Sequence, residues 1–323
     1  MILVTGGAGY IGSHYVQYER ERGSEVVVLD NLIYGHREAV LDAPLVIGDL
    51  TKREVLDQVF AKYKIDAVVH FAAFASVNES VSFPERYYQN NVAGTMTLLD
   101  AMRDHGIKNF VFSSSCATYG NPQYVPMDEK HPQAPINPYG DSKFICEKMM
   151  SAYSHAHGLR FVSLRYFNAA GADPEGRIGE SHEPETHIIP IILQVAKGMR
   201  EKVTVYGDDY DTPDGSCVRD YIHILDLAQA HSLAIERLRS GSESAFYNLG
   251  SETGYSVKQV IDICEKVTGK SINVIDGPRR AGDPPTLVAS AKKAKEELGW
   301  SPKYLELSDI VRMAWNWEQN KRY

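Results

Sequence analysis

The sequence predicts an α/β protein: a doubly wound parallel sheet followed by a smaller mixed α/β domain. Three observations predict this fold. Short apolar segments alternate with helix-length amphipathic segments through the first half of the chain. A glycine-rich turn follows the first apolar segment. The length of 323 residues suffices for about two domains, each with its own core.

The first half contains six short apolar runs that are typical of buried strands. They are Ile2–Thr5, Glu25–Leu29, Leu45–Ile47, Ala67–Phe71, Asn109–Ser113 and Phe161–Leu164. Consecutive parallel strands need helical crossovers of a dozen or more residues, and right-handed crossovers place helices on both faces of one sheet. Residues 1–175 are therefore expected to form a doubly wound domain of the Rossmann type.

The composition of the sequence changes after Asn168, because the segment from Gly171 to Pro184 is rich in glycine, proline and acidic residues. We expect the domain boundary there, with residues 176–323 as the second domain. Its predicted elements are, in order, Ile188–Met199, Val203–Val205, Leu225–Leu238, Phe246–Leu249, Val257–Val267, Ile272–Ile275 and two C-terminal helices. Residues 223–249 are expected to return to the first sheet, because a helix followed by an apolar strand resembles one more α/β layer.

Composition excludes several classes of protein. The net charge of −8 provides no basic field for nucleic acid. No run approaches the length of a membrane span, and no leader pattern follows Met1, so a cytoplasmic protein is expected. The four cysteines are far apart and are expected to be reduced thiols: Cys116, Cys146, Cys217 and Cys264. His155 and His157 lie on different helix faces, and no metal site is expected.

The turn from Gly6 to Gly12 follows the first strand and opens a helix. Its glycines allow the backbone to approach a pyrophosphate, whose charge the helix N-terminus then stabilises. Asp30 stands eighteen residues past Gly12, at the end of the second strand, where a carboxylate accepts hydrogen bonds from the adenosine ribose. A carboxylate there repels a 2′-phosphate, and Asn31 adds no positive charge. NAD is therefore predicted over NADP.

A second pair of residues indicates proton-transfer chemistry. Tyr139 and Lys143 are one helical turn apart, just after the predicted helix cap formed by Asn137 and Pro138. A nearby ammonium, with the cationic nicotinamide ring, stabilises phenolate and lowers the pKa of a tyrosine. Upstream, Ser113–Ser115 follow an apolar strand and place hydroxyls at its carboxyl end, where open α/β sheets bind ligands.

These motifs resemble the extended short-chain dehydrogenase/reductases and, within them, the UDP-glucose (UDP-galactose) 4-epimerases. The resemblance covers nearly the whole chain. The more selective motif in the second half runs from Tyr206 to Gly215 and leads into Arg219–His223. The matching segments of the first half are Gly6–Gly12, Asp30–Asn31, Gly48–Leu50, His70–Ala73, Asn90–Val92, Ser113–Gly120, Pro138–Lys143 and Arg165–Asn168.

The resemblance implies an NAD-dependent isomerase that interconverts UDP-glucose and UDP-galactose by transient oxidation at the sugar C4. Tyr139 would be the acid/base, Ser115 would hydrogen-bond the 4-oxygen, and Lys143 would hold the nicotinamide ribose. The implied cofactor-binding residues are Gly6, Gly9, Tyr10, Ile11, Gly12, Asp30, Asn31, Asp49, Leu50, Phe71, Ala72, Ala73, Asn91, Ser113, Tyr139, Lys143 and Phe167. The implied substrate-binding residues are Ser115, Tyr139, Asn168, His187, Ile188, Thr204, Tyr206, Arg219, Arg280, Asp283 and Leu287.

The resemblance also implies a homodimer through the helices around Tyr87–His105 and Asp141–His157. One departure concerns Phe74-Ala75, where family members often carry Leu-Lys; a cation that helps to hold the cofactor is missing. Cys116-Ala117 stand where dTDP-sugar 4,6-dehydratases have Asp-Glu, which argues against a lyase. A 4-epimerase for UDP-glucuronate, UDP-pentoses or UDP-N-acetylhexosamines stays open, and a non-catalytic NAD-sensing regulator ranks last.

Overall fold

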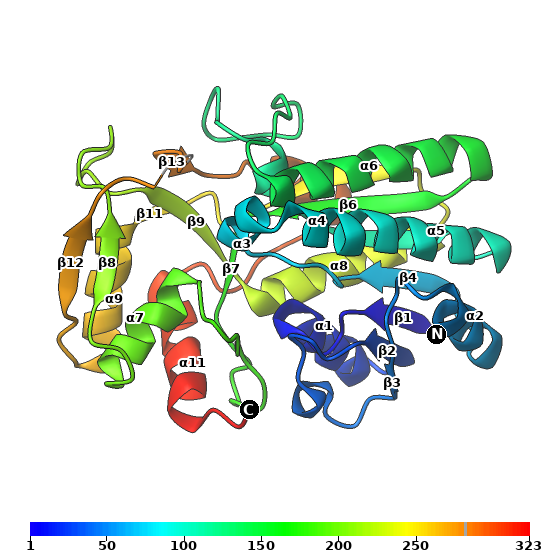
Figure 1. Ribbon diagram of the computed structural model, residues 1–323, viewed down its shortest axis with the longest axis horizontal. Helices are drawn as coiled ribbons and strands as arrows, with labels where there is room; N and C mark the ends of the chain where they lie inside the picture. The colour runs from blue at the N-terminus through cyan, green and yellow to red at the C-terminus, as the bar shows by residue number, and fades with distance from the viewer. Residues whose placement is uncertain (281–282) are drawn as a thin grey trace.

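The computed structural model describes residues 1–280 and 283–323 (Figure 1). A seven-stranded parallel sheet has the order β10-β6-β5-β4-β1-β2-β3. Its strands are β1 Ile2–Thr5, β2 Val26–Asp30, β3 Leu45–Ile47, β4 Ala67–His70, β5 Asn109–Ser115, β6 Arg160–Tyr166 and β10 Ala245–Leu249. The predicted fold class, a doubly wound sheet with a smaller second domain, is confirmed. β10 lies next to β6 at the edge of the sheet.

Helices cover both faces of this sheet, because alternate side chains of each strand point to opposite faces. Ile2 and Val4 of β1 pack in one apolar layer, whereas Leu3 packs in the other. The first layer is closed by α1 (Tyr10–Glu21) and α8 (Ile224–Arg239). The second is closed by α2 (Arg53–Lys62), α5 (Gly94–Asp104) and α6 (Pro138–His157).

The segment before α5 is less regular than a single long helix. It consists of α3 (Val77–Ser82), α4 (Pro84–Tyr87) and a π-helical stretch (Tyr88–Ala93) that leads into α5. Two short 3₁₀ turns, Arg37–Val40 and Cys116–Thr118, lie in loops.

The smaller domain lies beside the sheet and contains two small sheets (Figure 1). β9 pairs with β7, β11 and β13, and β8 pairs with β12. The strands are β7 Asn168–Ala170, β8 Val203–Tyr206, β9 Val218–His223, β11 Gly254–Ser256, β12 Val274–Gly277 and β13 Thr286–Leu287. The helices are α7 Ile188–Ala196, α9 Val257–Thr268, α10 Lys292–Leu298 and α11 Leu307–Asn320. The apolar core of this domain lies between α7, α9 and α11.

Several element boundaries differ from the sequence prediction by one to three residues. α7 ends at Ala196 rather than Met199, because Gly198 adopts a φ of +80° and the amides of Gly198 and Met199 cap the last helical turn. The predicted strand Ile272–Ile275 is shifted to Val274–Gly277, where it pairs with β8. In the part of the chain that the structure describes, no helix combines the length and apolarity needed to cross a membrane.

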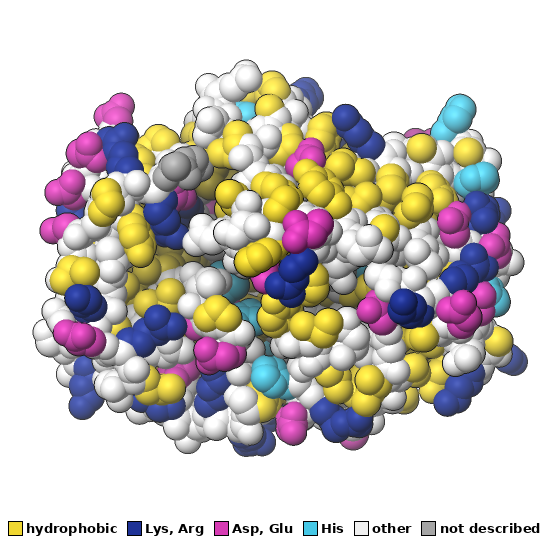
Figure 2. Space-filling model, viewed as in Figure 1, with side chains coloured by type: hydrophobic (Ala, Val, Ile, Leu, Met, Phe, Trp, Pro, Cys, Tyr) yellow, Lys and Arg dark blue, Asp and Glu magenta, His cyan; other side chains and the backbone are white. Residues whose placement is uncertain are grey.

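The strand order places a binding crevice beside β1. The chain proceeds from β1 to β2 on one side and returns to β4 on the other, and such a reversal leaves a crevice at the carboxyl ends of the strands. β6 continues almost directly into β7 of the smaller domain. Figure 2 shows a hollow between the two parts of the molecule.

Candidate active site

The turn between β1 and α1 is built so that only glycine fits at its ends. Gly6 has a φ of +73°, and a Cβ there would lie 2.5 Å from the amide nitrogen of Ala72. A Cβ on Gly12 would lie 2.2 Å from the carbonyl oxygen of Gly6. α1 begins after Gly9, and within the described residues no side chain caps its first amides. The free N–H groups and the close backbone approach fit a pyrophosphate.

A cleft continues from this turn along the ends of β2 and β4. Asp30 stands at the end of β2, where Oδ2 accepts a hydrogen bond from the amide of Ala8 at 2.9 Å and Oδ1 accepts one from Leu32 at 2.8 Å. These bonds orient the carboxylate and leave further lone pairs for ribose hydroxyls. Burial raises the pKa of Asp30. The residues that line the cleft are Gly6, Gly9, Leu29, Asp30, Asn31, Ile33, Tyr34, Gly35, Gly48, Leu50, Phe71, Ala72, Ala73, Phe74 and Asn90.

This lining contains many of the residues predicted to bind the cofactor, and it adds some that the sequence analysis missed. Tyr34 and Phe74 both line the cleft and pack edge to face, with ring centroids 5.5 Å apart. Asn91 holds Phe74 in place: its side chain accepts from the Phe74 amide at 2.9 Å and donates to the Phe74 carbonyl at 3.0 Å. Only their position in the sequence could have indicated these residues. Tyr34 follows the end of β2, Phe74 follows the end of β4, and Asn90 precedes Asn91.

Other predicted cofactor residues take structural partners. The hydroxyl of Tyr10 donates to the carbonyl of Gly171 at 2.7 Å, so its ring is held against the segment after β7. Ile11 packs on the apolar layer of α1 and α8. Asp49 accepts a hydrogen bond from Thr51 at 2.8 Å. Tyr10 and Ile11 have their backbone at the start of α1, and their contact with a pyrophosphate stays a prediction.

The predicted catalytic residues stand at the end of β5 and the start of α6. β5 continues to Ser115, two residues past the predicted end, because Ser113–Ser115 pair with Leu164–Tyr166 of β6. The predicted helix cap is confirmed: Asn137 Oδ1 accepts a hydrogen bond from the amide of Gly140 at 2.9 Å. This cap fixes the start of α6 and with it Tyr139 and Lys143.

The protein's own groups raise the pKa of Tyr139 rather than lower it. Burial raises the pKa of Tyr139 to about 12, and the hydroxyl of Ser115 lowers it in part through a hydrogen bond. The ammonium of Lys143 donates to the carbonyl of Ser113 at 2.7 Å, and burial lowers the pKa of Lys143 to about 8. Lys143 is not among the groups that shift the pKa of Tyr139, and the expected joint action of its ammonium and a nicotinamide ring stays a prediction. A further positive charge beside the phenol is needed to stabilise phenolate.

A buried ion pair that the sequence analysis did not identify lies under these residues. Arg165 donates to Glu147 at 2.9 Å through Nε and at 2.7 Å through Nη2. The same carboxylate accepts from Ser114 at 2.7 Å and from Ser163 at 2.8 Å. The network ties α6 to β5 and β6. Its sequence signal was the spacing of Glu147, one turn past Lys143 on the same face of α6.

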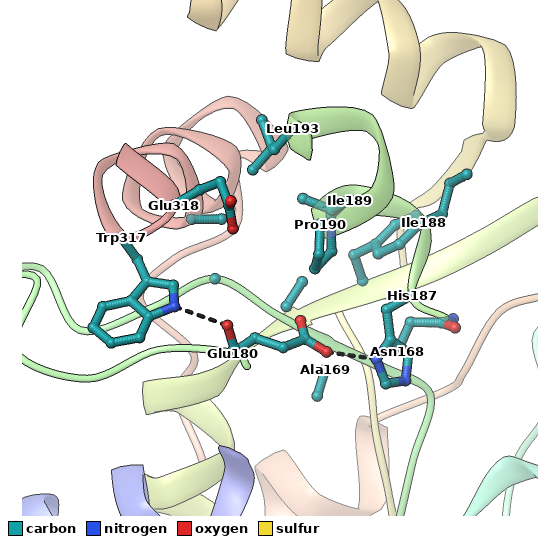
Figure 3. A pocket seen from close by; sticks show the side chains of 14 residues that line it. Asn168, Ala169, Glu180, His187, Ile188, Ile189, Pro190, Leu193, Trp317 and Glu318 are labelled. Atoms are coloured by element: carbon teal, nitrogen blue, oxygen red, sulfur yellow. Dashed lines mark hydrogen bonds and ion pairs between the residues drawn. The ribbon is translucent and has the colours of Figure 1, made fainter. Parts of the chain in front are cut away.

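A second pocket lies where β7 meets the smaller domain (Figure 3). It brings together three predicted substrate residues: Asn168, His187 and Ile188. The side chain of Asn168 donates to the carbonyl of Asp220 at 2.9 Å. The remaining lining residues are Ala169, Ala170, Gly171, Glu180, Ile189, Pro190, Leu193, Tyr221, Ala314, Trp317 and Glu318.

The predicted diphosphate-binding arginines converge on one carboxylate. Asp283 lies 2.8 Å from Arg219 Nη2 and 3.4 Å from Arg280 Nε. The guanidinium of Arg280 also lies 4.5 Å from the ring centroid of Tyr206, two residues past Thr204 on β8. Two guanidinium groups beside one carboxylate leave a net positive charge.

Leu287 joins this group of residues to the predicted catalytic centre. It pairs with Arg219 between β13 and β9. Its side chain packs in a cluster with Cys116, Phe167 and Met127. The cluster places Leu287 close to the end of β5, because Cys116 directly follows Ser115.

Comparison with known proteins identifies the class. Residues 2–250 match the model of the NAD dependent epimerase/dehydratase family, and the chain belongs to this family. A UDP-glucose 4-epimerase of Halalkalibacterium halodurans is 55% identical over 318 residues, which cover 98% of this chain and 95% of the relative. One of Lacticaseibacillus casei is 54% identical over 320 residues, with coverage of 99% and 97%.

A solved structure agrees with these sequence relatives. The crystal structure of a UDP-glucose 4-epimerase from Brucella ovis in complex with NAD is 49% identical, with a TM-score of 0.95 and 97% coverage of each chain. The predicted resemblance to the UDP-glucose 4-epimerases is confirmed.

Proposed function

We propose that this protein is an NAD-dependent isomerase that interconverts UDP-glucose and UDP-galactose by transient oxidation at the sugar C4. Relatives named UDP-glucose 4-epimerase, alike over almost the whole chain, support this activity. The observation that carries the proposal is the position of Ser115, Tyr139 and Lys143. They stand at the end of β5 and the start of α6, and β5 pairs with β4, which leads into the cleft that contains the glycine turn and Asp30.

Bound NAD would supply a hydride acceptor for C4 of the sugar and, once reduced, the hydride donor for the opposite face, so that no net oxidation results. The hydroxyl of Tyr139 removes the proton of the 4-hydroxyl and later restores it. Ser115 hydrogen-bonds the 4-oxygen. Lys143 holds the nicotinamide ribose. Burial raises the pKa of Tyr139 to about 12, and the positive charge of a bound nicotinamide ring, together with the Lys143 ammonium, would favour the phenolate.

The arginines beside Asp283 supply positive charge opposite the negatively charged diphosphate of the substrate. Arg219 and Arg280 bind the diphosphate, since a guanidinium fork matches phosphate oxygens. Asp283 binds the uridine ribose, and Thr204 and Tyr206 hold the uracil. Asn168, His187 and Ile188 contact the nucleotide-sugar from the pocket at β7.

Alternative activities differ in the residues that they need. A 4,6-dehydratase needs an extra acid and base after the catalytic hydroxyl, and Cys116 supplies neither, because burial raises its pKa to about 12. UDP-glucuronate, UDP-pentoses and UDP-N-acetylhexosamines share the same chemistry at C4 and remain candidate substrates. A non-catalytic NAD sensor has no need of Ser115, Tyr139 and Lys143 together.

Incubation with single UDP-sugars, without added NAD, tests the proposal. UDP-glucose and UDP-galactose are each expected to give the same mixture of the two, with no net oxidation or reduction. A folded Tyr139→Phe protein that retains NAD is the control and is expected to give almost no product. Conversion of neither sugar, or loss of water from a dTDP-sugar instead, contradicts the proposal.

We further propose that the protein acts in the cytoplasm as a homodimer. All four cysteines are free thiols, as is usual in a reducing compartment. The predicted dimer surface around Tyr87–His105 and Asp141–His157 carries exposed apolar side chains, including Tyr88 and Met96. In this proposal residues 1–175 with 223–249 bind the cofactor and residues 176–323 hold the nucleotide-sugar. The cleft at β2 and β4 is lined by residues of the first part, whereas the pocket at β7 is lined by residues of both.

A further inference from the structure

The loop that leads into α7 gathers four residues of metal-binding type. They are Glu180, His182, Glu185 and His187, and one ligand atom from each lies within 4.8 Å of all the others. Nδ1 of His187 is 2.5 Å from Glu180 Oε1 and 3.5 Å from Glu185 Oε1. Nδ1 of His182 is 3.2 Å from Glu180 Oε1 and 3.9 Å from Glu185 Oε2. Figure 3 shows the carboxylate of Glu180 pointing toward His187.

The two carboxylates of this cluster are buried without a permanent cation. Glu180 and Glu185 are each 6% exposed. Among residues 1–280 and 283–323, no lysine or arginine forms an ion pair with either carboxylate. Burial of a carboxylate costs several kcal/mol unless an opposite charge compensates it. The two imidazoles, or a cation held with them, must supply that charge.

Glu185 provides the observation that points to a ligand. Its Oε1 accepts hydrogen bonds from the amides of Thr186 and His187, at 2.8 and 2.9 Å. These bonds fix the orientation of the carboxylate. The other oxygen, Oε2, is fully buried and has no hydrogen-bond partner in the described structure. Metal ligands have this arrangement: a buried carboxylate oxygen without a hydrogen-bond partner is oriented toward an imidazole nitrogen.

We propose that Glu180, His182, Glu185 and His187 bind one divalent metal ion of the zinc class. Zinc bonds to imidazole nitrogen and carboxylate oxygen of about 2.0–2.2 Å place tetrahedral ligand atoms about 3.3–3.6 Å apart. The separations of 3.2 Å between His182 and Glu180 and of 3.9 Å between His182 and Glu185 Oε2 lie around this value, and the 2.5 Å pair of His187 and Glu180 opens slightly when the metal enters. Four protein ligands leave no open position, so the ion is structural.

The site lies where three helices meet beside the pocket at β7. The carbonyl of Glu180 accepts a hydrogen bond from Trp317 Nε1 of α11 at 2.8 Å. The ring of His182 lies 6.3 Å from that of Tyr10 at the start of α1. His187 is the residue before α7. A metal ion would therefore fix the loop against α1 and α11 and set the start of α7, which gives these ligands a positioning role.

Metal content and metal binding test this site. The purified protein is stripped with a chelator, returned to zinc-free buffer and titrated with Zn²⁺, with Mg²⁺ as the hard-cation control. We expect about one zinc per chain by mass spectrometry, no uptake of Mg²⁺, and a higher unfolding temperature with zinc. Co²⁺ in its place is expected to show the visible absorption bands of tetrahedral coordination.

Variants within the loop separate a metal site from a cluster of ion pairs. Glu185→Gln and His182→Ala are expected to weaken zinc binding by about tenfold or more, in line with the loss of a ligand. Glu183→Gln removes an exposed carboxylate of the same loop and is expected to bind zinc like the unchanged protein. The proposal is overturned if the unchanged protein takes up no zinc, a result that does not depend on the folding of any variant. Equal zinc affinity in the unchanged, Glu185→Gln and His182→Ala proteins also overturns it.

Discussion

Replacing Glu147 with glutamine tests how much the buried network under the catalytic residues stabilises the protein. Glu147 is 2% exposed and Arg165 is 3% exposed, and two hydrogen bonds of 2.9 and 2.7 Å join them. Glutamine keeps the shape of the side chain, but it leaves the guanidinium charge buried and turns an amide N–H toward donors. Removal of one partner of such a pair costs about 3–5 kcal/mol. The same loss is expected in the free energy of unfolding of Glu147→Gln.

Urea denaturation at 25 °C, followed by circular dichroism, measures this loss. The matched control is Glu236→Gln, which removes a carboxylate paired with Arg22 at 2.6 Å on the surface. Exposed pairs contribute about 0–1 kcal/mol, so the control is expected to stay within that range. A double variant with methionine at both Glu147 and Arg165 is expected to recover part of the loss. The reasoning is refuted if Glu147→Gln loses no more stability than Glu236→Gln.

Three further substitutions test the site. Tyr139→Phe is expected to lower kcat about 10²–10⁴-fold while NAD stays bound, because only the acid/base hydroxyl is lost; near-normal turnover by the folded variant would exclude this role. Asp30→Ala is expected to relax the preference for NAD over NADP, measured as reconstitution of activity with each cofactor, whereas equal use of both by the unchanged protein would contradict the role of Asp30. Leu287→Ser is expected to raise the ratio of activity on UDP-N-acetylglucosamine to activity on UDP-glucose and Leu287→Tyr to lower it, since one methylene of overlap costs about 1–3 kcal/mol. A ratio that does not change would show that Leu287 only packs in its cluster.

The first sheet and the start of its binding crevice could be predicted from the sequence, because their signals are local. An apolar run followed by a glycine turn and a helix specifies β1, the turn and α1 over a few residues. The cap at Asn137 works through a hydrogen bond to a residue three positions away. The position of Asp30 could be predicted as well. The lengths of the first crossover and of the second strand determine that this residue lies at the end of the strand.

Side-chain direction and contacts between distant segments depended on the tertiary structure. The spacing of Tyr139 and Lys143 predicts a shared helix face, yet the ammonium donates to the carbonyl of Ser113 on another element, and burial raises the pKa of Tyr139. Tyr10 lies in the predicted motif, but its hydroxyl binds Gly171, 161 residues away. Such contacts leave no local signal, because they depend on how whole elements pack.

The cluster of Glu180, His182, Glu185 and His187 could not be predicted from the sequence either, although its members are close together in the chain. All four residues lie within one loop of the sequence, where no helix or strand period predicts which side chains converge. Only the fold brings their ligand atoms together and buries the two carboxylates, with the loop in contact with residues of α1 and α11. The sequence by itself determined the order of the elements and the chemistry that each carries. The tertiary structure decided which polar groups lose water and must therefore find a partner.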